Sequence, residues 1–186
     1  MHIPKKGLRA LGIAESFTGR IHSTLAGVVM RKDLRVDGVV FGTVTVGGMD
    51  ATDTIIEMIN ALNRQDLNVI MLSGCVIAWF NVIDPSFIHD KTELPVIGIT
   101  YEASEGLSAD ILHHFPGDTS RLIAYEQLGE RTPFELHTGY TVFLRSWGIE
   151  RSDASRLCDD FTLEGKIPEP LRLARLCAHS YMQKID

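Results

Sequence analysis

Two acidic residues stand where an α/β protein would carry a metal-dependent site. Glu15 directly follows the apolar run Leu8–Ala14, and Asp50 lies between a β-branched run and residues with helical spacing. In open α/β sheets, ligands bind beyond the carboxyl ends of the strands. Mg²⁺ and Mn²⁺ prefer oxygen ligands, and such an ion can polarise a phosphodiester and ionise a bound water. We therefore predict that Glu15 and Asp50 converge on a divalent cation as catalytic and metal-binding residues.

Each acid also has a plainer interpretation. Asp50 or Thr52 could cap the following helix by accepting its free N–H groups, and Glu15 could be a solvated strand end. Ser73 ends another apolar run and could assist as a third catalytic candidate, and Asp84 is a third candidate metal ligand. From these residues alone, the metal site and the plainer interpretation both remain open.

The segment Gly74–Asp84, G-C-V-I-A-W-F-N-V-I-D, offers candidate substrate contacts. Trp79 and Phe80 could stack on a nucleobase, although such a pair is more often core, and we expect at least one of the two there. Asn81 could line the cleft or cap the next helix. Tyr101, which follows a buried strand, is a further candidate.

The periodicities predict an order of elements typical of a mixed sheet with helices on its faces. Ile55, Ile59 and Leu62 recur at helical intervals, and the runs 68–72 and 95–100 suit strands buried on both faces. This order matches a ribonuclease-H-like α/β architecture, as a single domain of residues 1–186. The predicted strands are 8–14, 24–30, 36–46, 68–72, 95–100 and 138–144. The predicted helices are 51–63, 82–91 (beginning around Asp84-Pro85), 107–114, 120–128, 152–161 (capped by Ser152) and 168–184.

The composition is ordinary for a soluble globular protein, with 186 residues, 45% hydrophobic and 23% charged. No apolar run is long enough to cross a membrane, and the N-terminus lacks the apolar region of a signal peptide. The three cysteines, Cys75, Cys158 and Cys177, form no C-x-x-C pair, which favours free thiols in a reducing compartment. We expect a cytoplasmic protein without a membrane partner.

The net charge of −6 argues mildly against nucleic acid as a partner, because phosphate binding normally leaves a basic footprint. A metal-dependent nuclease nevertheless carries acids in its site, and a local basic patch can exist on an acidic protein. The sequence does not show whether the basic residues share a face, and it gives no signal for the oligomeric state. The candidates for phosphate contacts are Lys5, Lys6, Arg9, Arg31, Lys32, Arg35, Arg145, Arg151 and Arg156.

Four segments together resemble an archaeal family related to endonuclease V, sometimes labelled endonuclease dU. They are G-G-M-D-A-T-D-T-I-I-E-M-I (47–59), I-M-L-S-G-C-V-I-A-W-F-N-V-I-D (70–84), L-P-V-I-G-I-T (94–100) and K-I-P-E-P-L-R-L-A-R-L (166–176). The resemblance runs from Leu8 to about Ala178. Its most specific point in common with endonuclease V itself is P-E-P-L-R-L-A, residues 168–174.

The resemblance implies a ribonuclease-H-type enzyme that uses Mg²⁺ to cut nucleic acid near deaminated bases. The first catalytic aspartate of endonuclease V falls on Glu15, its catalytic glutamate on Asp50, and its third carboxylate on Ser73, where a hydroxyl replaces a charge. A lysine of endonuclease V falls near Tyr101. A C-terminal histidine of endonuclease V falls near residues 148–150, which contain no histidine. The loss of one carboxylate weakens Mg²⁺ binding, because affinity follows ligand charge and number.

The wedge with which endonuclease V probes for the damaged base falls on residues 40–43, V-F-G-T. This stretch has neither of the family's prolines and keeps one aromatic residue, Phe41, which becomes a candidate substrate contact. The missing prolines put specificity for deaminated bases in doubt.

Three hypotheses follow. The first is a Mg²⁺- or Mn²⁺-dependent endonuclease or phosphodiesterase that acts on nucleic acid at deaminated bases. The second is a nucleic-acid-binding protein on the same fold that does not cut. The third is a small-molecule or phosphate-binding α/β domain, which the acidic pI of about 5.6 permits.

Overall fold

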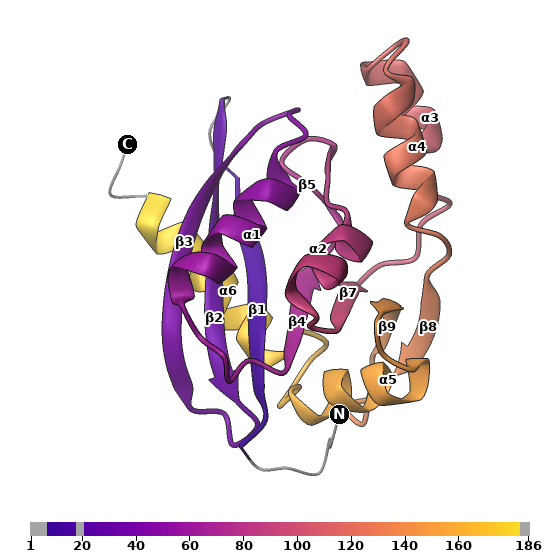
Figure 1. Cartoon of the computed structure of the whole chain (residues 1–186). Coiled ribbons are helices and arrows are strands. Elements are labelled where there is room, and N and C mark those ends of the chain that lie inside the picture. Colours follow the sequence, from indigo (N-terminus) through magenta and orange to yellow (C-terminus); the bar gives the residue numbers. More distant parts are fainter. Residues whose placement is uncertain (1–6, 18–20, 183–186) are drawn as a thin grey trace.

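The computed structural model describes residues 7–17 and 21–182, in which three strands come first and groups of helices and strands then follow in turn (Figure 1). The strands are β1 (Arg9–Ser16), β2 (His22–Arg31), β3 (Val36–Thr45), β4 (Val69–Ser73), β5 (Val76–Ile77), β6 (Asn81–Val82), β7 (Val96–Thr100), β8 (Thr132–Glu135) and β9 (Thr141–Trp147). The helices are α1 (Ala51–Leu62), α2 (Pro85–Thr92), α3 (Ser108–His114), α4 (Thr119–Gln127), α5 (Arg151–Asp160) and α6 (Glu169–Met182).

Seven strands form a mixed sheet in the order β3-β2-β1-β4-β7-β9-β8, and β5 pairs with β6 in a separate small hairpin. β1, β4 and β7 run parallel to one another, whereas β2 and β9 run antiparallel to their neighbours. The carboxyl ends of β1, β4 and β7 therefore meet at one edge of the sheet. Along this edge Ile13 pairs with Leu72, and Ser73 pairs with Ile99.

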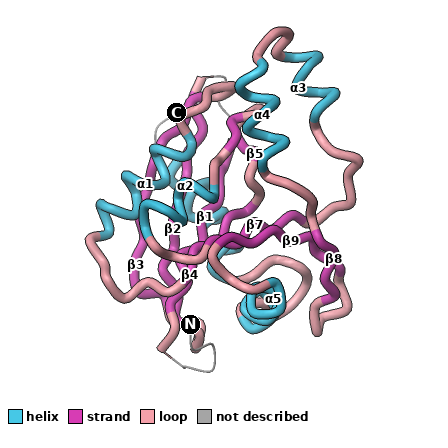
Figure 2. The backbone as a smooth tube through the Cα atoms, turned by 45° about the vertical axis from the view of Figure 1, so that its right-hand side comes forward, coloured by secondary structure: helices cyan, strands magenta, loops and turns pink. Residues whose placement is uncertain are grey.

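Helices cover both faces of this sheet, so its central strands are apolar on both sides. Leu11 and Ile70 belong to a core that includes side chains of α1 and α2. Their neighbours Ala10 and Val69 point to the opposite face, into a second core with side chains of α5 and α6. Figure 2 shows α5 beside β8 and β9, whereas α3 and α4 form a hairpin that stands away from the sheet.

The P-E-P segment lies at the start of α6, where this helix approaches β1 closely. A Cβ atom on Gly12 would lie 2.5 Å from the carbonyl carbon of Pro170, so the approach requires glycine. Glu169 is buried beside it, and its carboxylate accepts hydrogen bonds of 2.8 and 2.7 Å from the Arg172 guanidinium. The segment therefore has a structural role, which is to seat α6 on the sheet.

The prediction of a mixed α/β sheet flanked by helices is confirmed, and each predicted strand and helix is present with ends shifted by a few residues. Three short strands, β5, β6 and β8, were not predicted. Ser152 does not cap α5, because the helix begins one residue earlier with Glu150 at its cap position. The predicted end of the last helix, at 184, lies outside the described residues. Within 7–17 and 21–182, no helix combines the length and hydropathy of a membrane span.

Candidate functional site

The carboxyl edge of the sheet opens into a pocket of about 540 Å³ at the ends of β1, β4 and β7. Glu15, Ser73 and Tyr101 all line it. The parallel register of the three strands brings these residues together, as their positions after apolar runs predicted. Three of the residues that the sequence singles out therefore share one pocket.

A larger pocket, about 950 Å³, lies at the opposite edge, where Leu8, Asn68 and Pro95 precede β1, β4 and β7. Its charged lining residues are all acidic: Glu93, Glu150 and Asp153. Acidic walls repel phosphate, and open α/β sheets place ligands at the carboxyl edge. The pocket around Glu15 is therefore the candidate functional site.

Glu15 is half-buried, and the residues around it fix its carboxylate. The Ala78 N–H donates to both carboxylate oxygens, at 3.1 and 2.9 Å, and the Ser23 hydroxyl donates to Oε2 at 2.9 Å. Ser23 itself is fully buried on β2. The solvated strand end of the plainer interpretation is therefore wrong, and Glu15 enters the pocket as a positioned acid.

Ser73 and Tyr101 supply two hydroxyl groups to the same pocket, with 3.5 Å between Oγ and Oη. Burial raises the pKa of Tyr101 to about 12, so its hydroxyl is neutral at physiological pH. Lys166 holds the strand end behind them, because its Nζ donates to the Tyr101 carbonyl at 3.2 Å and contacts the Glu102 carboxylate. The pair can donate hydrogen bonds to an anionic ligand without adding negative charge.

Three arginines give the pocket a local positive balance against its two glutamates: Arg131, Arg145 and Arg175. Arg131 holds the loop after β7, through bonds of 3.2 Å to the Glu102 carbonyl and 2.8 Å to the Ser104 carbonyl. The Nε of Arg145 donates to the Gly129 carbonyl at 2.9 Å. Arg175 is exposed on α6. Arg145 and Arg175 are therefore the cations best placed for a ligand phosphate.

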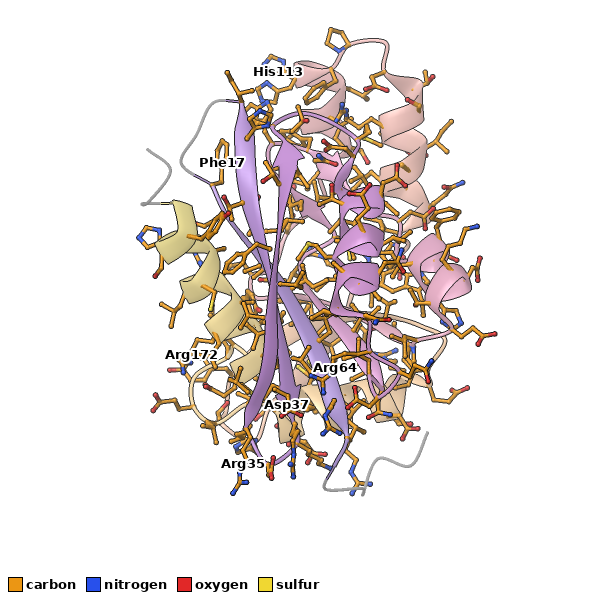
Figure 3. All side chains as sticks on the ribbon, turned by 60° about the vertical axis from the view of Figure 1, so that its left-hand side comes forward. Phe17, Arg35, Asp37, Arg64, His113 and Arg172 are labelled. Carbon is orange, nitrogen blue, oxygen red and sulfur yellow. The ribbon has the colours of Figure 1, made fainter. Side chains whose placement is uncertain are left out.

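Most of the other basic candidates pair with acids instead of facing the pocket. Arg9 contacts Asp37 and Asp66, and Lys32 contacts Asp160 at 2.7 Å. Figure 3 shows Arg35 and Asp37 at one end of the sheet, and Phe17, which lines the pocket, towards the other. Arg31 and Arg156 also form ion pairs, Arg151 is exposed outside the pocket, and Lys5 and Lys6 lie outside the described residues.

The Asp50 carboxylate is engaged by neighbouring residues outside the pocket of Glu15. Asp50 occupies the cap position of α1 but makes no side-chain cap bond, and it does not line the pocket of Glu15. Its carboxylate instead accepts the Thr45 N–H at 3.0 Å, the Thr45 hydroxyl at 2.7 Å and the Asn81 amide at 2.6 Å. Partial burial would raise the pKa of Asp50, but the hydrogen bonds from Thr45 and Asn81 outweigh it and hold the pKa below its usual range. Asp50 therefore holds the carboxyl end of β3 through Thr45, the last residue of that strand.

Asn81 is a structural residue, since it is fully buried. Its Oδ1 accepts the Ala51 N–H at 3.1 Å, which caps α1 from across the chain, and its Nδ2 donates to Asp50 and to the Thr45 carbonyl. These three bonds use both N–H donors and one acceptor position of the amide. Asn81 was predicted to contact the substrate, but its amide instead links the end of β3 and the start of α1 to the β5–β6 hairpin.

The turn of the β5–β6 hairpin is strained, because three consecutive residues other than glycine have positive φ. The φ angles are 41° at Ala78, 59° at Trp79 and 62° at Phe80. The left-handed conformation costs about 1–2 kcal/mol per residue for L-amino acids. Such strain persists only where the surroundings hold it in place, and it concentrates at functional sites.

Arg121, which the sequence did not single out, holds this turn. It is 4% exposed, and its guanidinium donates to the carbonyls of Gly47, Gly48 and Phe80. Its Nε donates to Asp118 at 3.0 Å. An arginine on a mixed polar helix gives no sequence signal, since its three carbonyl partners are distant in the chain.

The aromatic candidates Trp79, Phe80 and Phe41 lie in different environments. Trp79 is 50% exposed, whereas Phe80 packs edge-on against Trp79 and against Phe115, with centroids 5.3 and 5.9 Å apart. Phe80 is half-buried and belongs to none of the hydrophobic core clusters of the described residues, so the expectation that at least one of this pair lies in the core is wrong. Phe41 lies on β3, stacked at 4.4 Å on Tyr181 of α6, and does not line the pocket.

The structure does not bring the three predicted metal ligands together. Asp84 caps α2 by accepting the Phe87 N–H at 2.9 Å and lines a separate pocket with Trp147. Among residues 7–17 and 21–182, no three His, Cys, Asp or Glu side chains are placed to hold an ion. Of the predicted acids, only Glu15 lies beside Ser73. With one carboxylate and one hydroxyl from the protein, a Mg²⁺ ion here would need waters and a substrate phosphate to complete its ligands.

Comparisons with known proteins agree with this fold. A family model described as endonuclease dU matches residues 6–182. The chain belongs to the endonuclease dU family. A UPF0215 protein of Pyrobaculum calidifontis is 38% identical over 170 residues, which cover 90% of this chain and 93% of that protein.

Two solved structures extend the comparison. The crystal structure of a protein of unknown function from Archaeoglobus fulgidus superposes with a TM-score of 0.81 and 25% identity, covering 94% of this chain and 98% of that one. Endonuclease V of Ciona intestinalis, in complex with a 24mer DNA containing an inosine followed by a ribo-adenosine, gives a TM-score of 0.65 and 13% identity, covering 96% and 87%. This endonuclease dU family member therefore has a fold that resembles endonuclease V.

Proposed function

We propose that this protein is a phosphodiesterase that cuts nucleic acid at the pocket around Glu15. The observation that carries the proposal is the meeting of a positioned carboxylate, Glu15, with the guanidinium groups of Arg145 and Arg175 in one pocket at the carboxyl edge. Membership of the endonuclease dU family and a fold like that of a DNA-bound endonuclease V both suggest a nuclease-like protein that acts on nucleic acid.

The arginines account for binding the strand. The whole chain has a net charge of −6, so a strand is attracted only where cations gather locally. Arg145 uses Nε for its bond to the Gly129 carbonyl, which leaves its two terminal nitrogens for a ligand, and Arg175 is exposed on α6. Guanidinium groups bind phosphate oxygens in a paired geometry, which fixes the position of the backbone as well as its charge.

Glu15 accounts for the chemistry, either as a base towards an attacking water or as a metal ligand. Ala78 and Ser23 fix its orientation, and a carboxylate accepts about four hydrogen bonds in total, so these contacts leave it free capacity. The neutral hydroxyls of Ser73 and Tyr101 can donate to charge that develops on the phosphate. Mg²⁺ or Mn²⁺, held by Glu15 and Ser73, would supply Lewis-acid polarisation of the phosphodiester.

A second candidate function is binding without cleavage, and the position of Asp50 favours it. The residue that matches the second catalytic acid of endonuclease V is engaged by Thr45 and Asn81 outside the pocket. A single pocket carboxylate beside Ser73 binds a divalent cation more weakly than two or three do. The protein would then recognise a strand with the same arginines and leave it intact.

To test this proposal, the purified protein is incubated with end-labelled single strands that contain uracil, inosine or only undamaged bases. Each strand is tested in the presence of Mg²⁺, Mn²⁺ or EDTA. Cleavage in Mg²⁺ or Mn²⁺ that is lost in Glu15→Gln and kept in Glu57→Gln supports the phosphodiesterase. Glu57 is an exposed acid on α1 outside the pocket, so it is a matched control.

The remaining outcomes separate the other hypotheses. Binding that weakens with salt, without cleavage under any condition, supports the second function. No binding at low salt rejects both and leaves a small-molecule ligand. Faster cleavage of uracil or inosine strands than of undamaged strands would establish specificity for deaminated bases.

A further inference from the structure

Trp79 combines two unfavourable features that the fold alone does not explain. Its backbone is in the middle of the left-handed turn, with φ 59°, and half of its large apolar side chain faces solvent. Glycine or asparagine would occupy such a position with less strain. Its neighbours differ, because Ala78 is buried and the Phe80 ring packs against Phe115. Within this turn, the Trp79 indole is therefore the side chain that faces solvent.

The surroundings hold this indole in a defined orientation. The His114 and Phe80 rings lie 4.9 and 5.3 Å from it, centroid to centroid, and a Cβ on Gly47 would lie 3.7 Å from its Cδ1. Hydrogen bonds hold the backbone turn of residues 78–80 at its first and last residues. The Ala78 carbonyl accepts the Gly47 N–H at 2.7 Å, and the Phe80 carbonyl accepts from the Arg121 guanidinium. A ring fixed in this way loses little conformational entropy when a ligand stacks on it.

The turn that carries the indole also contacts the candidate site. The residue before Trp79, Ala78, donates its N–H to the Glu15 carboxylate, which lines the pocket with Arg145. Figure 3 shows His113, the neighbour of His114, at the end of the molecule towards which Phe17 also lies. An exposed aromatic residue therefore directly follows the backbone N–H that holds the Glu15 carboxylate of the candidate site.

We infer that Trp79 is a stacking platform for an unpaired base of the strand whose phosphate occupies the Glu15 pocket. The inference rests on the proposed function and names its substrate class, single-stranded or locally unpaired nucleic acid. A base inside a duplex offers no free face to the indole and must first leave the stack. An apolar protein surface fits this location less well, because arginines line the adjoining pocket.

The first test measures affinity. Trp79→Ala is compared with the parent for a single strand, for the duplex of the same sequence and for an abasic strand with the same phosphates. We expect about tenfold weaker binding of the single strand, because base–aromatic stacking is worth that order per base, and little change for the abasic strand. Trp79→Phe restores most of the affinity. Tyr140→Ala removes an equally exposed aromatic residue elsewhere and leaves binding unchanged.

The second test uses fluorescence. The chain has two tryptophans, so Trp147→Phe makes Trp79 the only indole. Single strands should quench its emission to saturation, and the abasic strand should bind without quenching. Equal affinity of Trp79→Ala and the parent for single strands, with Arg145→Ala weakened, would overturn the platform and leave the proposed function standing. Failure of every strand to bind the parent at low salt would overturn the proposed function and the platform with it.

Discussion

The Glu15 carboxylate accepts the Ala78 N–H with both oxygens, at 3.1 and 2.9 Å. The acid at the end of β1 therefore also anchors the strained turn that carries Trp79. One backbone N–H joins the two parts of the proposed site, the Glu15 pocket and the exposed indole. A change that alters the Glu15 oxygens should affect chemistry, whereas a change that releases the turn should affect base contacts.

Glu15→Gln separates these two effects. The amide oxygen can still accept the Ala78 N–H, so we expect the free energy of unfolding to fall by no more than about 1 kcal/mol. Cleavage should fall about 100-fold or more, since the variant has no carboxylate for general-base catalysis or metal binding. Single-turnover cleavage and urea denaturation measure the two quantities. Unchanged cleavage by Glu15→Gln would show that Glu15 is not the acid that acts.

Arg121→Lys should destabilise the protein while conserving its charge. Lysine cannot reach the carbonyls of Gly47, Gly48 and Phe80 together, and each buried carbonyl left without a donor costs about 1–3 kcal/mol. We expect a loss of about 2–4 kcal/mol in the free energy of unfolding, measured by urea denaturation. Arg35→Lys, at a side chain 76% exposed, is the control and should change it by less than about 0.5 kcal/mol.

The sequence predicted the main elements because their patterns are local. The apolar run of β1 and the helical spacing of α1 are each contained in a dozen residues, and the prediction from them is confirmed. The β5–β6 hairpin escaped because its strands have two residues each and its turn contains no glycine. No sequence rule places Ala78-Trp79-Phe80 in a left-handed turn, since contacts from distant residues hold it there.

Some residues of the candidate site could likewise be predicted from the sequence, whereas others could not. Glu15, Ser73 and Tyr101 could be predicted because strand ends share an edge in a parallel sheet. Asp50 could not, because its partners Thr45 and Asn81 come together only in the folded chain. The resemblance to endonuclease V aligned Asp50 with a catalytic glutamate, but it could not show that Thr45 and Asn81 engage the Asp50 carboxylate.

Asp50→Asn should destabilise the protein in a pH-dependent way. The folded-state pKa of Asp50 lies below its usual range, so the ionised carboxylate stabilises the folded state above the unfolded pKa. That contribution is lost as pH falls through the lower, folded pKa. We expect the variant to lose about 1–2 kcal/mol at pH 7 and to approach the parent below about pH 4. Urea denaturation across pH 3–7 measures the gap, and a gap independent of pH would contradict the role of the charge.

Arg145→Ala should reduce the salt dependence of binding to single strands. Each phosphate contact contributes about 0.7 to the slope of log affinity against log salt, so we expect the slope to fall by about that amount. Fluorescence anisotropy at several salt concentrations measures it. Arg151→Ala removes an exposed arginine outside the pocket and should leave the slope unchanged. Equal slopes for both variants and the parent would remove Arg145 from the phosphate contacts.

Gly12→Ala should destabilise the seating of α6 on β1. The new Cβ would lie 2.5 Å from the backbone carbonyl carbon of Pro170, which cannot rotate away as a side chain could. Overpacking of this kind costs about 1–3 kcal/mol, and the shift of α6 would also move Arg175, which lines the pocket from that helix. Gly7→Ala is the matched control, because nothing lies within 4 Å of its Cβ position. We therefore expect urea denaturation to show the loss for Gly12→Ala alone, accompanied by weaker single-strand binding, and equal stability of the two variants would contradict the close approach.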